Sequence, residues 1–141
     1  MTRQQQWATR AFEAVADVCK NHNDYKDKCL SQFKSLPNLL LQSGAVQTVA
    51  FLTAKAKGKN ENDSQKQEKT KNKENEYKIV LDKLAYVYQS SADKLLKNLR
   101  GDDKKDDLHR YLSMSRDLID CAIWLRRFAQ ANDESNGGEQ Q

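Results

Sequence analysis

The chain has 141 residues, of which 38% are hydrophobic and 31% are charged, and its formal net charge at pH 7 is +4. This length fits one domain with a single core. A mean hydropathy of -0.94 argues against a membrane span, which needs roughly 20 mostly apolar residues. Residues 1–10 contain no apolar signal-peptide core, so we expect a cytoplasmic protein.

The first predicted helix runs from about Arg3 to Lys20, where apolar residues recur at steps of three and four. A shorter second helix is expected around Tyr25, Cys29 and Phe33, which lie four residues apart. Each pattern places the apolar side chains on one helical face, which is typical of helices that share a core.

The segment LPNLLLQSGAVQTVAFLTAKAKG (36–58) has no formal charge between Lys34 and Lys55. Pro37 fits the first turn of a new helix, so we expect a break before it and one helix from there to about residue 57. Apolar side chains occupy more than one side of this helix, which predicts burial all round, Phe51 included. Gly44 lowers helix stability by roughly 1 kcal/mol relative to Ala, which indicates a close neighbour.

Residues 59–75, KNENDSQKQEKTKNKEN, contain no apolar side chain, and we expect a flexible Lys/Asn/Gln-rich insertion there. A helix is predicted around Tyr77–Tyr88, followed by a short one that begins near residue 91 and ends at Gly101. The last helix is expected from Asp103 to about Ala131, and the acidic tail 132–141 is expected to be disordered. The sequence therefore predicts an all-α, compact bundle of five to six helices, with residues 1–131 as its single domain.

Two aromatic residues of the last predicted helix, Trp124 and Phe128, lie opposite the apolar stripe that contains Ile119. A second apolar side needs a cover. Either another helix of the same domain or a partner subunit could supply it.

Residue types that carry catalytic chemistry are sparse. The three cysteines, Cys19, Cys29 and Cys121, lack CxxC spacing, which argues against a disulfide framework and a zinc knuckle. Neither His22 nor His109 has a partner at a spacing that would build a catalytic relay. Without a phosphate-binding glycine motif either, we expect no enzyme, no metal and no cofactor.

Positive charge is distributed unevenly. Segment 55–74 carries seven Lys against four acidic residues. Arg116 and Arg127, eleven residues apart, fall within about 20° of each other on one helix face. Such a stripe could follow a phosphate backbone. It could equally be an ordinary solvated face, because Asp117 and Asp120 lie nearby.

The order of motifs resembles the small helical subunit of the type III-B CRISPR RNA-silencing complex, the Cmr complex. Two separated anchors carry the resemblance: a leucine-proline, glycine and glutamine-threonine-x-alanine-phenylalanine-leucine pattern, and W-L-R-R-F-A-x-A at residues 124–131. The matching residues expected to pack are Leu36, Pro37, Gly44, Gln47, Thr48, Phe51, Leu52, Trp124, Leu125 and Phe128. Ala45 and Val49 depart from the family pattern, which usually has leucine at both positions.

The resemblance implies a non-catalytic subunit of the inner filament, which stacks with further copies of itself beside the backbone and large subunits. It implies contacts to crRNA and target RNA, for which the basic residues Lys55, Lys57, Arg116, Arg126 and Arg127 are the candidates. Two alternatives stay open at the level of sequence. One is the small subunit of type III-A complexes, and the other is a helical adaptor that binds only protein.

Overall fold

A computed structural model describes residues 2–57, 75–89, 94–95, 99 and 107–140, with side chains in the last helix described from 109 to 132. The elements of this part of the chain are five α-helices and one short 3-10 helix, with no strand among them. The predicted all-α class and helix number are thereby confirmed for the described residues. None of the described helices has the length and apolar character that crossing a bilayer requires.

Helix α1 (Arg3–Asn21) begins where the sequence predicts. Thr2 caps it: the Thr2 hydroxyl accepts a hydrogen bond from the backbone N–H of Gln5 at 3.1 Å, and the Gln5 side chain accepts one from the Thr2 N–H at 2.8 Å. This reciprocal capping box satisfies donors that the first turn leaves unpaired. The buried face of α1 consists of Trp7, Ala11, Ala14, Val15 and Val18.

The predicted break before Pro37 is wrong. After the 3-10 helix η1 (Asn23–Tyr25), a single helix α2 (Lys26–Ser43) runs through Pro37. Proline cannot donate the helical hydrogen bond, which normally destabilises a helix interior. The helix continues because packing of an apolar face outweighs local propensity. That face is buried along its length and consists of Cys29, Leu30, Phe33, Leu36, Pro37 and Leu40.

Gly44 forms the corner between α2 and α3 (Ala45–Ala56), and it is not inside a helix as the sequence suggested. Its φ of 87° and ψ of 159° lie in a region that is essentially restricted to glycine. Its N–H donates to the Leu40 carbonyl and its carbonyl accepts from the Thr48 N–H, both at 3.0 Å. A Cβ at this position would lie 3.4 Å from the Tyr111 hydroxyl of the last helix. The expected close neighbour therefore exists, but the backbone conformation is what requires glycine.

Asn75 joins the end of α3 to the start of α5 (Glu76–Tyr88). Its side-chain oxygen accepts from the Lys78 N–H at 2.8 Å, and its side-chain nitrogen donates to the Lys55 and Ala56 carbonyls at 3.1 and 3.3 Å. These contacts satisfy polar groups at two helix ends at once. The predicted insertion 59–75 otherwise lies outside the described residues, so its flexibility stays a prediction.

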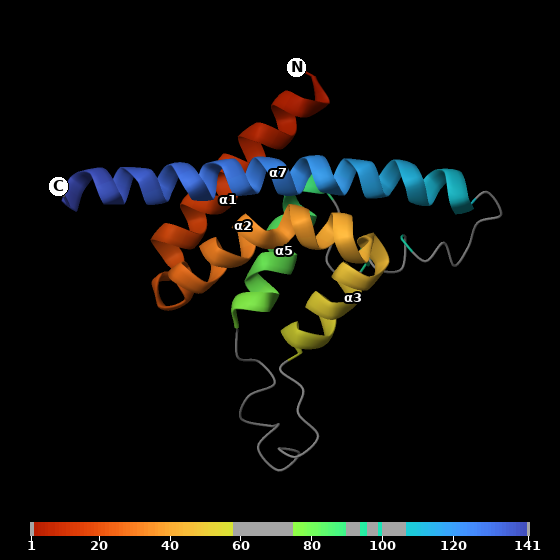
Figure 1. The fold of residues 1–141 in the computed structure, drawn as a ribbon, viewed down its shortest axis with the longest axis horizontal. Helices are drawn as coiled ribbons and strands as arrows, with labels where there is room; N and C mark the ends of the chain where they lie inside the picture. The colour runs from red at the N-terminus through yellow and green to blue at the C-terminus, as the bar shows by residue number, and fades with distance from the viewer. Residues whose placement is uncertain (1, 58–74, 90–93, 96–98, 100–106, 141) are drawn as a thin grey trace, which may run out of the picture.

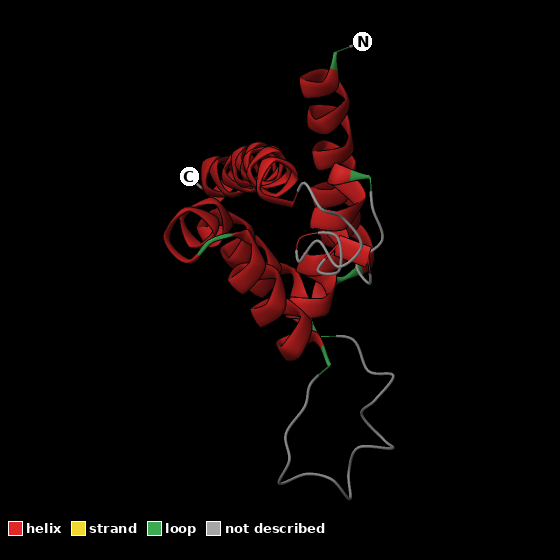
Figure 2. Ribbon diagram, turned by 90° about the vertical axis from the view of Figure 1, so that its right-hand side faces the viewer, coloured by secondary structure: helices red, strands yellow, loops and turns green. Residues whose placement is uncertain are grey.

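Helix α7 (Asp107–Gln140) lies across the other helices (Figure 1) and packs chiefly against α2 and α1, while α3 packs mainly against α5. In the view of Figure 2, α7 is seen close to end-on, beside α1 and above α2. Its inner face is at most 5% exposed and consists of Met114, Leu118, Cys121, Ala122, Leu125 and Ala129. Burial raises the pKa of the Cys121 thiol, which marks it as a structural residue and not a reactive one.

Most predicted boundaries of the last part of the chain fall on residues that the structure does not describe. The predicted start at Asp103 and most of the predicted helix from 91 to 101 lie outside the described residues, although Leu95 and Leu99 are buried. The predicted end of the last helix near Ala131 is wrong, because α7 continues to Gln140. The division of the chain at residue 131 stays a prediction.

Candidate nucleic-acid interface

The predicted arginine stripe of α7 is on the surface. Arg116 and Arg127 are both exposed, and Arg126 is half-buried on the flank of the helix. Asp117, which could have neutralised the stripe, pairs instead with α1, since its carboxylate lies 3.1 Å from the Arg3 guanidinium. Asp117 is therefore already paired with a cation of α1, which favours the basic interpretation of the neighbouring arginines.

Arg127 is positioned by an aromatic residue. Its guanidinium carbon lies 4.9 Å from the centroid of the Trp124 ring, and that ring stacks on Phe128 with centroids 6.1 Å apart and an interplanar angle of 22°. A guanidinium over an indole face is attracted by the π-system. Because Arg127 remains exposed, this contact orders the side chain at the surface without burying its charge.

Lys55 and Lys57 are exposed at the C-terminal end of α3. The Lys55 ammonium lies 5.7 Å from the centroid of the Phe51 ring, which meets Tyr77 of α5 edge to face at 5.9 Å. Phe51 is 43% exposed, so its predicted burial is wrong. The reason is that only one side of α3 is covered in the fold, and Phe51 lies beside that buried side.

The five predicted basic residues form two groups and not one patch. Lys55 and Lys57 end the helix α3 on the side of the molecule that lies away from α7 in both views (Figures 1 and 2). The three arginines belong to α7. A single straight strand of nucleic acid would therefore meet one group at a time on a given copy of the chain.

Helix α1 covers the second apolar side of α7. The Trp124 indole N–H donates to the Gln4 side-chain oxygen at 2.8 Å, and Phe12 meets Phe128 edge to face with centroids 5.5 Å apart. Of the two covers left open by the sequence, the structure thus contains the intramolecular one. The cover is incomplete, because Phe12 is 58% exposed.

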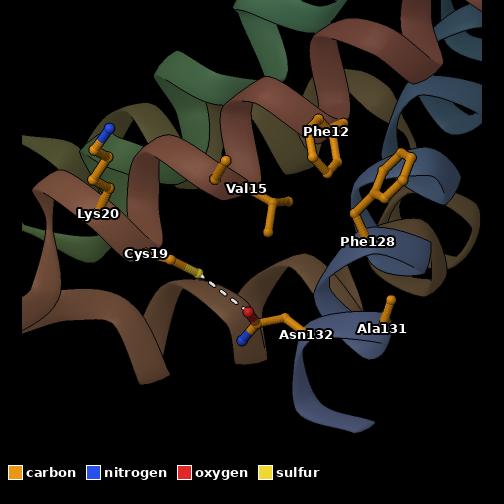
Figure 3. A pocket seen from close by; sticks show the side chains of 8 residues that line it. Phe12, Val15, Cys19, Lys20, Phe128, Ala131 and Asn132 are labelled. Atoms are coloured by element: carbon orange, nitrogen blue, oxygen red, sulfur yellow. Dashed lines mark hydrogen bonds between the residues drawn. The ribbon is translucent and has the colours of Figure 1, made fainter. Parts of the chain in front are cut away.

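Beside Phe12 the two helices enclose a groove of about 510 Å³ (Figure 3). It was not predicted from the sequence, which could have indicated only that Phe12 and Cys19, seven residues apart, share a face of α1. The residues that matter for its chemistry are Phe12, Val15, Cys19, Lys20, Phe128 and Asn132.

An ion pair ties α1 to α5. The Asp17 carboxylate pairs with the Lys83 ammonium, accepts a hydrogen bond from the Asn21 side chain, and lies 3.5 Å from Nε2 of His22. The hydrogen bond from Lys83 is the main cause that lowers the pKa of Asp17. Because Asp17 and Lys83 retain 35% and 18% exposure, we assign this cluster a structural role.

Within the described ranges, no group of three or more His, Cys, Asp or Glu side chains is placed to hold a metal ion.

Residues 3–132 match the family model of the CRISPR-associated protein Cas_Cmr5. The chain belongs to the Cmr5 family. This decides for the small subunit of the type III-B complex over that of the type III-A complex.

Two similar proteins from Thermus thermophilus extend this finding. The CRISPR system Cmr subunit Cmr5 is 31% identical over 132 residues, which cover 92% of this chain and 95% of that relative. The crystal structure of a CRISPR-associated Cmr5 family protein has a TM-score of 0.70 at 26% identity, with 93% of this chain and 96% of that chain covered.

The residues that carry the Cmr5 resemblance differ in burial. Gln47 and Phe51 are exposed, whereas Gly44, Trp124 and Phe128 are half-buried. The buried members are Leu36, Pro37, Thr48, Leu52 and Leu125. The motif thus contains both core and surface positions. The spacing of apolar residues in the sequence is not enough to tell which motif positions are buried.

Proposed function

We propose that this Cmr5-family chain is a non-catalytic subunit of a type III-B CRISPR effector complex in antiviral defence. It stacks with further copies of itself along the crRNA-bearing backbone and stabilises the pairing of crRNA with target RNA. The observation that carries the proposal is the family match, which extends over residues 3–132 and therefore over every described helix except the end of α7.

The RNA contacts are assigned to charge. Arg116 and Arg127 point outward from α7, and Arg127 is held over Trp124. In a complex guided by crRNA, base pairing selects the sequence and the protein binds shape and phosphate. We therefore assign phosphate contacts to these two arginines, to Arg126 on the flank, and to Lys55 and Lys57 on another copy or another part of the RNA.

Stacking makes a small number of contacts sufficient. A subunit with two or three phosphate contacts binds RNA weakly alone, but linked copies on one strand raise the effective concentration of each next contact. Large apolar side chains on the surface are available for contacts with other subunits, notably Leu41 with 65% and Leu112 with 48% exposure.

Purification of the tagged chain from its host tests the assignment to the complex. We expect recovery of the backbone and large Cmr subunits together with a short guide RNA. Recovery of protein partners without RNA, unchanged by salt, would instead identify a protein-only adaptor.

A Glu scan in the reconstituted complex tests the RNA contacts. Arg116→Glu and Arg127→Glu should weaken target-RNA binding about equally for every guide sequence, because phosphate carries no sequence information. The matched control is Lys28→Glu, at an exposed lysine of α2. Equal effects of all three variants would show that net charge alone matters and would overturn the assigned face.

A further inference from the structure

An aspartate of α7 lies close to the two arginines that are assigned to phosphate. At about 100° per residue, Asp120 falls within about 40° of Arg116 and about 20° of Arg127 around the helix axis. Arg116 and Asp120 are also four residues apart, the spacing at which opposite charges pair along a helix. A carboxylate turned toward Arg116 would therefore occupy that arginine in place of a phosphate.

The first turn of α1 holds this carboxylate and a second one beside it. The side-chain nitrogen of Gln4 donates to the Asp120 carboxylate at 3.2 Å, and the Arg3 guanidinium pairs with Asp117 at 3.1 Å. In the part of the chain that the structure describes, neither carboxylate forms an ion pair with an arginine of α7. Both acids are thus turned toward α1, and the arginines keep their charge for an external anion.

Gln4 makes a second contact through the other atom of the same amide. Its oxygen accepts from the Trp124 indole N–H at 2.8 Å, and the centroid of that ring lies 4.9 Å from the Arg127 guanidinium carbon. The two contacts fix the orientation of the amide, because an indole N–H only donates and an ionised carboxylate only accepts. One side chain therefore orients both an acid beside the arginines and the ring that supports Arg127.

The turn that carries these residues is itself well anchored. The capping box between Thr2 and Gln5 closes it, and the Arg3 guanidinium carbon lies 5.1 Å from the centroid of the buried Trp7 ring. A side chain positions its partners well when its own supports are fixed. The first turn of α1 meets this requirement.

We propose that Arg3 and Gln4 are positioning residues for RNA binding, which hold Asp117 and Asp120 away from the arginines of α7 and fix the ring that supports Arg127. They act through α7 and not by contact with RNA. This inference rests on the proposed function, since it names what prepares the arginine face for the RNA assigned to it.

The test is the affinity of the reconstituted complex for target RNA over a range of salt concentrations. Gln4→Leu removes both hydrogen bonds and should weaken binding about two- to fivefold, the affinity equivalent of one surface charge interaction. Gln4→Glu keeps the acceptor for Trp124 but sets a second carboxylate against Asp120, so it should weaken binding further. Both losses should shrink as salt rises, because salt screens exposed charges.

A double-mutant comparison separates positioning from folding. If Gln4 acts by holding the charge of Asp120, the loss of RNA affinity in Gln4→Leu should be smaller in an Asp120→Asn background. Arg3→Gln with and without Asp117→Asn forms the parallel comparison and should behave in the same way. Equal losses with and without the aspartate, at every salt concentration, would overturn the proposal, because a merely structural contact does not act through that charge.

The matched controls are Gln42→Leu and Gln42→Glu, at an exposed glutamine of α2. Both should leave RNA binding unchanged, and equal losses from Gln4→Glu and Gln42→Glu would overturn the proposal in favour of net charge. The unfolding midpoint of each variant should stay within a few degrees of the unaltered chain. If Gln4→Leu fails to fold, Gln4→Glu decides, since it retains the hydrogen bond from Trp124.

The inference and the proposed function can fail separately. Weaker RNA binding in Arg116→Glu and Arg127→Glu, with both Gln4 variants unchanged, would overturn only the positioning role. Unchanged binding in the two arginine variants would contradict the proposed RNA face, and the positioning role with it.

Discussion

The two apolar sides of α7 differ sharply in how they are covered. Leu118 and Leu125 on the inner side are 0% exposed, whereas Trp124 and Phe128 on the α1 side are half-buried and lie next to the exposed ring of Phe12. The inner side packs into the common core, while the α1 side lies at an edge where only one helix covers it. The same helix thus has one side that is closed inside the core and a second side that remains partly open to solvent.

The largest difference between the two sides should appear in stability. Leu125→Ala should lower the free energy of unfolding by about 2–5 kcal/mol, because a fully buried side chain leaves a cavity. Leu112→Ala, at a position that is 48% exposed on the same helix, should change it by about 0.5 kcal/mol or less. Urea titration followed by circular dichroism measures both. Similar losses for the two variants would contradict the assignment of Leu125 to the core.

Substitutions on the half-buried side of α7 should lower the free energy of unfolding less than those on the inner side. Trp124→Ala should lower the free energy of unfolding by less than the about 3–5 kcal/mol that is typical of a buried Trp. Part of that loss belongs to the hydrogen bond with Gln4, so Gln4→Ala combined with Trp124→Ala should cost less than the sum of the single changes. Strict additivity would show that the hydrogen bond between Trp124 and Gln4 contributes no coupling energy.

The corner at Gly44 lies next to Tyr111 of α7, whose hydroxyl would be 3.4 Å from a Cβ at residue 44. Gly44→Ala should lower the free energy of unfolding by about 1–3 kcal/mol, because the backbone conformation there is essentially restricted to glycine. Tyr111→Phe removes the nearest atom that the new Cβ would meet. If the loss in Gly44→Ala persists in the Tyr111→Phe background, strain in the backbone is the cause. If it disappears, the contact with the hydroxyl is the cause and our explanation is wrong.

Asp17 should make a small contribution to stability, and one that depends on pH. Its pKa is lowered below the ordinary value of 3.8, mainly by the hydrogen bond from Lys83, so the folded state favours the ionised carboxylate. Its contribution is therefore present above the unfolded value and is lost as pH falls through the lower folded value. Asp17→Asn should cost about 1 kcal/mol or less at neutral pH, and this difference should shrink below about pH 4. A difference that stayed constant with pH would contradict the assignment.

The sequence predicted well those features that depend on one helix alone. The 3.6-residue period located α1 and the inner side of α7. The spacing of Arg116 and Arg127 predicted only that they share one face of the last helix, and their exposure comes from the structure. Pro37 was misjudged because a local helix-breaking tendency was weighed without the burial that outweighs it. The Asn75 cap was missed inside a polar segment, although an Asn before Glu76 and an apolar run is an N-cap signal.

Features that depend on which helices meet could not be predicted. Phe51 is exposed because the fold covers only one side of α3. The sequence cannot predict which side is covered, because α3 has apolar residues on several sides. Arg3 and Asp117 form an ion pair although they lie more than 100 positions apart in the sequence. Among the described residues, the amide nitrogen of Asn132 is left unsatisfied because of the residues that surround it in the fold. These contacts are specified by the tertiary arrangement and not by any local pattern.

The most direct test of the central claim is the affinity of the reconstituted complex for target RNA over a range of salt concentrations, with Arg116→Glu and Leu125→Ala compared. We expect Arg116→Glu to keep the unfolding midpoint, to weaken RNA binding and to reduce the salt slope by about 0.7 for each lost contact, as for single strands. Leu125→Ala should lower the midpoint and leave the slope of the assembled complex unchanged. Unchanged affinity and slope in Arg116→Glu would contradict the claim that the outer face of α7 holds RNA.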